Sequence, residues 1–271
     1  MKLSNKTINR LKNAYGNWAL VTGATSGIGK ELAIKLAESG FNIVITGRRE
    51  ELLTTLKTTL TERFSVEIIP VTGDLSLQQD IAALLEKISH LSMGIVILNA
   101  GFGTSGKLIN ANIEDELNLV DLNCKTVLRM AHYFANKMKG ESRKGALVFL
   151  SSIVGFQGVP NAANYAASKA YVQSLGEGMA RELKPFGIHV LCAAPGPVNS
   201  GFAKRADMQM GNALEPKNIV NAILNAIGRK TTVFPGFLTK FLVFNLGLLP
   251  RWGKVRVMEK VMGGFTKHQQ A

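Results

Sequence analysis

Short apolar runs alternate with longer stretches of helical periodicity along most of the chain, from Trp18 to about Ile227. The apolar runs predict buried strands over residues 18–21, 41–46, 66–71, 94–98, 145–150 and 187–193. The periodic stretches predict amphipathic helices over residues 30–39, 50–63, 80–88, 114–139 and 164–184. Continuously apolar strands separated by such helices are typical of a parallel sheet that helices cover on both sides. The pattern therefore predicts an α/β protein with a Rossmann-type, doubly wound parallel sheet.

The length and composition of the chain indicate one globular domain. No linker, low-complexity segment or internal repeat divides the 271 residues. We expect a basic N-terminal extension over residues 1–17, a Rossmann core over 18–226 and a basic, apolar, helical extension over 227–271. Apolar residues make up 46% and charged residues 19% of the chain, which excludes a disordered protein. No apolar run reaches the roughly 18 residues of a membrane-spanning helix.

Cysteine content and charge limit the compartment and the partners of the protein. Cys124 and Cys192 are too few for a disulfide framework and belong to no nucleophile or metal motif. We therefore expect a reducing, cytoplasmic compartment and no metal site. The formal net charge is +13, but residues 1–17 carry +4 and residues 227–271 carry +7, so the body between them carries only +2. A nearly neutral body with two basic ends does not predict a nucleic-acid partner.

A glycine-rich turn follows the first predicted strand and opens the first predicted helix. It reads Thr22-Gly23-Ala24-Thr25-Ser26-Gly27-Ile28-Gly29. Its glycines let the main chain approach a pyrophosphate, and the helix N-terminus offers N–H groups and the positive end of its dipole. A plain tight turn is the alternative, but the turn stands where dinucleotide binding requires it. The predicted cofactor residues here are Gly23, Thr25, Ser26, Gly27, Ile28 and Gly29.

Residues after the second and third predicted strands indicate which dinucleotide binds. NAD enzymes usually place Asp or Glu after the second strand, whereas this chain has Gly47 followed by Arg48 and Arg49. Guanidinium groups suit a 2′-phosphate, so NADP is favoured over NAD; the alternative is a pair of solvated arginines that open a helix. After the third strand, Asp74 and Leu75 stand where an adenine ring is expected, although Asp74 also suits the N-cap of the next helix.

Three further side chains suit acid–base chemistry. Tyr165 and Lys169 are four positions apart and share a helix face, and Ser152 follows the end of a strand. A phenol ordinarily titrates near pH 10, and a nearby ammonium group lowers that pKa by stabilising the phenolate. Each residue alone suits a structural role. Together with a cofactor turn, they predict proton transfer to or from a substrate oxygen that Ser152 holds.

The order of these motifs resembles the short-chain dehydrogenase/reductase family over residues 18–225. The matching pieces are the glycine turn, Asn99-Ala100-Gly101, Asn123, the set of Ser152, Tyr165 and Lys169, and Pro195-Gly196-Pro197-Val198-Asn199-Ser200. Ser200 stands where the family has Thr and keeps the hydroxyl. The segment before the glycine turn is also similar to steroid and long-chain 3-oxoacyl reductases, and to bacterial reductases with a basic, apolar tail.

The resemblance implies an enzyme that interconverts a carbonyl and an alcohol. It implies that Tyr165 is the acid or base, that Lys169 binds the nicotinamide ribose and lowers the tyrosine pKa, and that Ser152 holds the substrate oxygen. Asn123 would anchor a water molecule between Lys169 and solvent. Cofactor contacts are implied for Asn99, Ala100, Gly101, Tyr165, Lys169, Pro195, Gly196, Val198 and Ser200. The alternative is a cofactor-binding sensor without turnover, which the intact catalytic set disfavours.

The same resemblance implies a homodimer or homotetramer that pairs through the helices over residues 114–139 and 164–184. The catalytic set contacts only the reacting oxygen of the substrate. Specificity is therefore expected from the loop after Gly101, from residues 153–161 and from residues 197–216.

The basic ends carry apolar residues at helical spacing. In the tail these are Phe237, Phe241, Phe244 and Leu248, and near the N-terminus they are Leu3, Ile8 and Leu11. An apolar face with a cationic flank is typical of a helix lying in an anionic membrane surface. The alternative is a tail that covers the substrate cleft or a neighbouring subunit. Both interpretations favour a lipid-like or polycyclic carbonyl substrate, and the first adds a peripheral membrane location.

Overall fold

The computed structural model describes residues 2–211 and 213–270 of the chain. Within those residues, seven parallel strands form one sheet in the order β3-β2-β1-β4-β5-β6-β7. The strands are β1 (Trp18–Thr22), β2 (Asn42–Gly47), β3 (Ile68–Thr72), β4 (Ile95–Leu98), β5 (Gly145–Leu150), β6 (Ile188–Ala193) and β7 (Thr232–Val233). The strand order reverses between β1 and β4, where a doubly wound sheet opens a crevice beyond its strand ends. The predicted fold class is confirmed.

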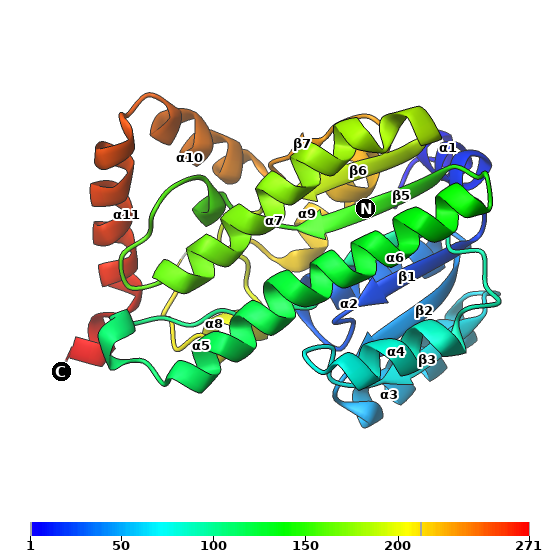
Figure 1. The fold of residues 1–271 in the computed structure, drawn as a ribbon, viewed down its shortest axis with the longest axis horizontal. Helices are drawn as coiled ribbons and strands as arrows, with labels where there is room; N and C mark the ends of the chain where they lie inside the picture. The colour runs from blue at the N-terminus through cyan, green and yellow to red at the C-terminus, as the bar shows by residue number, and fades with distance from the viewer. Residues whose placement is uncertain (1, 212, 271) are drawn as a thin grey trace.

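Helices cover both faces of this sheet (Figure 1). They are α1 (Asn5–Tyr15), α2 (Gly27–Glu38), α3 (Glu50–Arg63), α4 (Gln78–Lys87), α5 (Ile113–Val120), α6 (Thr126–Gly140), α7 (Ala163–Glu182), α8 (Gly201–Arg205), α9 (Pro216–Ala226), α10 (Phe237–Gly247) and α11 (Arg251–Phe265). Successive side chains of a strand point to opposite faces. Ala19 and Val21 of β1 thus join the core under α1, α2, α3 and α9, whereas Leu20 joins the core under α4, α5, α6 and α7.

The predicted helix over residues 114–139 contains one irregular turn. A π-helical turn over Asp121–Lys125 joins α5 to α6, with the N–H of Thr126 bonded to the carbonyl of Asp121. Such a turn holds one extra residue and often occurs at functional sites. Here it carries Asn123, whose amide bonds twice to the main chain of Phe102 (Nδ2 to O 2.8 Å, Oδ1 to N 3.1 Å). The predicted long helix is therefore confirmed, and the π-helical turn inside it is a feature that the sequence did not indicate.

The N-terminal extension packs into the core. Leu3, Leu11 and Tyr15 are buried against the sheet layer that α2 and α9 cover. Arg10 donates hydrogen bonds to the main-chain carbonyls of Ile227 and Asn225. The expectation that this segment presents an apolar face to a membrane is therefore wrong, because the protein interior already covers its apolar residues.

The C-terminal extension forms α10 and α11 at the end of the molecule opposite α1 (orange to red in Figure 1). Met258 and Met262 of α11 share an apolar cluster with Ala166 of α7. Beyond α11, Gln269 Nε2 donates to the hydroxyl of Ser105 at 2.9 Å. The extension is therefore fastened to the side of the sheet where the strands end. None of the helices in the described residues has both the length and the apolar character needed to cross a membrane.

Candidate active site

A cavity of about 560 Å³ lies beyond the carboxyl ends of the central strands. Residues that follow those strands form what we call its floor: Gly23, Gly47, Asp74 and Asn99 follow β1, β2, β3 and β4. Apolar side chains of the C-terminal helices form what we call its roof: Leu242, Leu246, Val257, Met258, Val261, Met262 and Phe265. The cavity thus lies at the position where open α/β sheets bind their ligands.

All but two of the residues predicted for the site line this cavity. Those that do are Gly23, Thr25, Ser26, Gly27, Ile28, Arg48, Arg49, Asp74, Leu75, Asn99, Ala100, Gly101, Ser152, Tyr165, Lys169, Pro195, Gly196, Val198 and Ser200. The two others, Gly29 and Asn123, lie just behind the cavity wall. A Cβ on Gly29 would lie 2.3 Å from the carbonyl oxygen of Gly23, so this glycine permits the close approach of α2 to β1.

The start of α2 fits a phosphate group. Gly27 has a φ of 56°, and a Cβ there would lie 3.0 Å from the Cβ of Ser200. The N-cap residue Ser26 makes no side-chain capping hydrogen bond. Because the first N–H groups of a helix lack intrahelical partners, this end of α2 offers donors and a positive dipole end to an anion in the cavity.

Two arginines stand beside that helix end. Arg49 Nη2 donates to the hydroxyls of Thr25 (2.7 Å) and Ser26 (3.2 Å). Arg48 pairs with Asp74, with 3.4 Å between Nη1 and Oδ2, and its side chain stays half exposed. Both guanidinium groups therefore lie where they could bind a further phosphate of a dinucleotide.

Asp74 stabilises its own turn rather than the next helix. Its Oδ1 accepts hydrogen bonds from the main chain (3.0 Å) and hydroxyl (2.8 Å) of Ser76, whereas α4 begins at Gln78 with Leu77 as its N-cap. The N-cap alternative for Asp74 is therefore wrong. Burial alone would raise the pKa of Asp74, but the bonds from Ser76 and the charge of Arg48 lower it overall. Asp74 thus remains an ionised hydrogen-bond acceptor.

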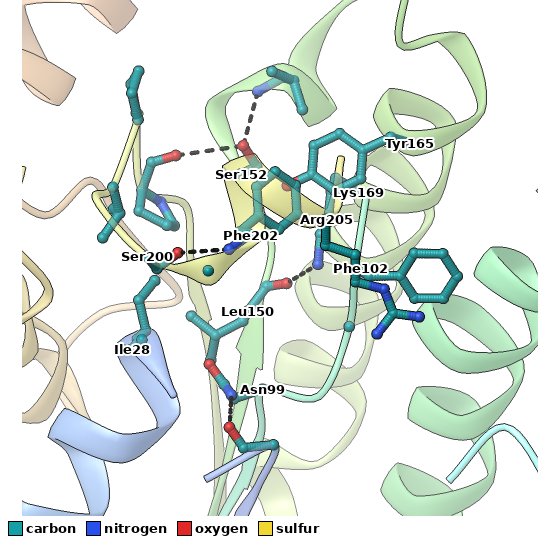
Figure 2. A pocket seen from close by; sticks show the side chains of 18 of the residues that line it. Ile28, Asn99, Phe102, Leu150, Ser152, Tyr165, Lys169, Ser200, Phe202 and Arg205 are labelled. Atoms are coloured by element: carbon teal, nitrogen blue, oxygen red, sulfur yellow. Dashed lines mark hydrogen bonds between the residues drawn. The ribbon is translucent and has the colours of Figure 1, made fainter. Parts of the chain in front are cut away.

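The three predicted catalytic side chains meet on the floor (Figure 2). Tyr165 and Lys169 come from α7, and Ser152 comes from the residues after β5. Lys169 Nζ donates to the carbonyl of Leu150 at 2.8 Å and lies 5.8 Å from the centroid of the Tyr165 ring. The Phe202 ring stands 5.1 Å from the Tyr165 ring, so the tyrosine lies between the polar floor and an aromatic neighbour.

Burial controls the protonation of this set. It raises the pKa of Tyr165 above its ordinary value, and a hydrogen bond with Ser152 opposes the shift. Burial lowers the pKa of Lys169 to about 8. Burial of the phenol thus outweighs the lowering of its pKa that is expected from Lys169, whose ammonium group bonds to the carbonyl of Leu150. At neutral pH Tyr165 is a protonated phenol that can donate its proton.

Asn123 acts behind this set rather than in the cavity. Its Nδ2 donates to the hydroxyl of Ser168 at 3.0 Å, and that hydroxyl donates to the carbonyl of Tyr165 at 2.7 Å. Together with its two bonds to Phe102, these contacts connect the π-helical turn, the loop after β4 and the first turns of α7. The side chain of Asn123 thus fixes the first turns of α7, which carry Tyr165, relative to the loop after β4.

Sequence reasoning named only part of the remaining wall. Ile153, Val154, Phe102 and Met208 line the cavity from the three segments expected to give specificity. Arg205 also lines it, with its guanidinium carbon 3.9 Å from the centroid of the Phe102 ring, and no motif distinguishes it in the sequence. The roof residues are predicted only by the alternative in which the C-terminal tail lies over the substrate cleft. The structure agrees with that alternative.

These features are typical of a nicotinamide-dependent oxidoreductase: a helix end that fits a phosphate, a buried phenol with a neighbouring lysine, and a crevice at the switch point of the sheet. The short chain dehydrogenase family matches residues 17–211, and the chain belongs to this family. It is therefore an oxidoreductase that acts on a CH–OH or C=O group.

Individual relatives are similar over most of the chain. A 7beta-hydroxysteroid dehydrogenase from Clostridium sardiniense is 28% identical over 84% of this chain and 89% of its own. A very-long-chain 3-oxoacyl-CoA reductase from Coccidioides immitis is 30% identical over 93% of this chain and 74% of its own; two other reductases of that name match over 64% of their length. A solved short-chain dehydrogenase from Sphingobium yanoikuyae in complex with NADPH has a TM-score of 0.77 and 27% identity, over 84% of this chain and 92% of its own.

Proposed function

We propose that the protein is an NADPH-dependent carbonyl reductase of bulky, apolar substrates. One observation carries the proposal: a single cavity holds Ser152, Tyr165 and Lys169 between a floor that fits a dinucleotide and a roof made of apolar side chains. The floor supports the cofactor, the set supports the reaction, and the roof supports the class of substrate.

The preference for NADP over NAD follows from the end of β2. Gly47 ends the strand where a carboxylate would accept ribose hydroxyls, and Arg48 and Arg49 line the cavity directly after it. A relative solved with NADPH supports this choice. The N-terminal turn of α2 would hold the pyrophosphate, and the two arginines would hold the 2′-phosphate.

The reaction needs one proton from the protein. When bound, the cofactor supplies a hydride to the carbonyl carbon of the substrate. Ser152 donates a hydrogen bond to the carbonyl oxygen, and Tyr165 donates its proton to that oxygen as the alcohol forms. The charge of Lys169 stabilises the phenolate that remains, until a proton from solvent restores the phenol. In the reverse direction the phenolate of Tyr165 accepts the hydroxyl proton.

The substrate class follows from the roof. Its side chains are apolar, and five of them lie on α11: Val257, Met258, Val261, Met262 and Phe265. Methionine side chains adapt to irregular apolar shapes, and two relatives are named for a steroid and a very-long-chain acyl substrate. A polycyclic or long-chain ketone therefore suits the cavity better than a small polar one.

Association of two copies is part of the proposal. Ile113, Leu117 and Leu128 on α5 and α6, and Tyr171 on α7, are exposed apolar side chains away from the cavity. These are the helices through which the family resemblance implies a dimer. Pairing would cover the exposed apolar area and would leave the roof free.

Replacing the phenol tests the proposed function. We expect Tyr165→Phe to lower kcat/KM for reduction of a bulky ketone by about 10²- to 10⁴-fold, the usual contribution of a general acid. Cofactor binding should persist, because the floor is unchanged. Steady-state oxidation of NADPH gives the first quantity, and quenching of protein fluorescence by NADPH gives the second.

Tyr171→Phe is the matched control, because Tyr171 lies exposed on the same helix. It should retain full activity. If the wild-type protein binds NADPH but oxidises none of it with a broad panel of steroid, long-chain and aromatic ketones, the alternative of a cofactor sensor replaces the proposal.

A further inference from the structure

Helix α10 presents apolar side chains to solvent as well as to the cavity. Leu242 and Leu246 line the cavity. On the solvent side, five large side chains of α10 and its junction with α11 are between 54% and 84% exposed, and we call them the outer face: Phe237, Phe241, Phe244, Leu248 and Trp252. A helix that is apolar on both sides is normally enclosed by an apolar medium. The outer face is therefore a surface that something else covers.

The charge around the outer face indicates the nature of that partner. From Phe237 to Met258 the chain has no acidic residue and four basic ones: Lys240, Arg251, Lys254 and Arg256. The guanidinium group of Arg256 lies over the Trp252 ring, 5.3 Å from its centroid. Exposed aromatic side chains surrounded by cations fit an anionic interface with an apolar interior.

A second copy of this chain fits the outer face poorly. In a two-fold dimer the same patch lies against itself, so the basic residues of one copy would face those of the other with no acidic side chain between Phe237 and Met258 to pair with them. Like charges brought together in this way repel. A lipid bilayer offers the opposite charge and the apolar medium together.

We propose that the outer face is a docking surface for an anionic lipid bilayer. Docking inserts the aromatic side chains among the lipid headgroups and places the basic residues at the phosphates. Because the other side of α10 is the roof of the cavity, the roof then lies against the lipid. Resting on the proposed function, this arrangement makes the bilayer the source of the apolar carbonyl substrate.

Vesicle binding by the full chain tests the docking surface. The probes are vesicles of phosphatidylcholine alone and of phosphatidylcholine with phosphatidylglycerol, measured by co-sedimentation. We expect binding to the anionic vesicles to exceed binding to the neutral ones by at least about tenfold and to weaken as salt is added. Phe237→Ser with Phe241→Ser should weaken it by about tenfold or more.

Two matched controls separate the outer face from general stickiness. Leu108→Ser with Ile109→Ser removes two apolar side chains that are exposed elsewhere and should leave binding unchanged. Lys240→Gln with Arg251→Gln should weaken binding by about 30-fold, since each basic residue at a membrane surface contributes about a fivefold factor. The same loss of charge in Lys2→Gln with Lys6→Gln, on and beside α1, should have little effect.

The proposal is overturned if the wild-type protein does not bind the anionic vesicles, or if it binds RNA and not vesicles. It is also overturned if the outer-face variants and their matched controls lose the same affinity for the vesicles. Reduction of a water-soluble ketone without vesicles is measured in parallel, and the outer-face variants should retain it. Vesicle binding without any reduction would refute the proposed function and leave the docking surface intact. Reduction without vesicle binding would refute the docking surface and leave the proposed function intact.

Discussion

The floor and the roof of the cavity are built in opposite ways. The floor consists of short polar or glycine segments that each follow a strand, and directional bonds fix them, such as that from Asn99 Nδ2 to the carbonyl of Thr22 at 2.8 Å. The roof consists of apolar side chains, which α11 holds in place through the cluster of Met258 and Met262 with Ala166. Directional bonds set the geometry of a reaction, whereas apolar packing tolerates many shapes. In the proposed function, chemistry and substrate range thus belong to different parts of the chain.

We expect residues of the floor to lower the free energy of unfolding while they support the reaction. The largest such effect is expected at Lys169. We expect Lys169→Met to lower carbonyl reduction by at least about 100-fold, because the phenolate loses its cation. The free energy of unfolding at pH 7 should rise by about 2 kcal/mol. In the wild type, the pKa of the buried ammonium is about 8 in the folded state against 10.5 in the unfolded state, which lowers the free energy of unfolding by about 3 kcal/mol at pH 7. In the variant, the carbonyl of Leu150 has lost this donor, which takes back about 1 kcal/mol of that gain.

The sign of the pH dependence provides the control. Between pH 8 and 10.5 the unfolded wild-type chain binds more protons than the folded one, so wild-type stability rises with pH in this window. The advantage of Lys169→Met should therefore shrink as the pH approaches 10.5. Urea unfolding at pH 7 and pH 10 measures both values. A variant that is less stable than wild type at pH 7 would contradict the assignment of a costly buried charge.

The same contrast explains what the sequence could predict. The floor was predictable because its motifs are local: the turn from Gly23 to Gly29 must follow a strand and open a helix, whatever the rest of the fold does. The elements around it were predictable for a similar reason, and α3 and β5 have the predicted bounds, since Glu50–Arg63 and Gly145–Leu150 keep a clear period or an unbroken apolar run.

The roof and the π-helical turn depend on contacts that periodicity does not record. Met262 lies almost 100 residues after Ala166, and only tertiary packing brings them together. The extra residue in the turn at Asn123 is stabilised by bonds to Phe102, a residue in another segment. For the N-terminal helix, the sequence predicted an apolar face toward a membrane, whereas that face is buried in the core. The helical spacing of Leu11 is the same in both cases, so periodicity could not distinguish them.

A second prediction concerns how the floor selects its cofactor. Arg48→Ala should raise the Kd for NADPH by about tenfold and change that for NADH by less than about twofold, because one charge-assisted contact with the 2′-phosphate is lost. Calorimetric titration with each cofactor measures this. Lys57→Ala removes the same charge from the exposed side of α3 and should alter neither Kd. Equal losses for both cofactors would show that Arg48 does not distinguish them.

The roof should affect the substrate and not the reaction. We expect Met262→Ala to raise KM for a long-chain or polycyclic ketone by about fivefold, the effect of losing roughly 1 kcal/mol of apolar contact. The kcat for a small water-soluble ketone should stay within about twofold of wild type. Lys260→Ala, exposed on the same helix, is the control. If the variant instead lowers kcat for every ketone equally, Met262 supports the catalytic floor and the division between floor and roof fails.

The smallest expected effect comes from replacing glycine by alanine, once in the helix that carries the roof and once in the floor. Gly263 lies within α11, and a Cβ there would meet no atom within 4 Å. Gly263→Ala should therefore raise the free energy of unfolding by about 0.5–1 kcal/mol, the difference in helix propensity between the two residues. In the floor, Gly29→Ala should lower it, because the added Cβ would lie 2.3 Å from the carbonyl oxygen of Gly23 and 2.4 Å from Asn99 Nδ2. Denaturant unfolding of both variants measures the signs. We expect opposite signs because α2 is fixed against β1 at van der Waals contact, while α11 has free space on its outer side. A loss of stability in both variants would mean that the roof is packed as tightly as the floor.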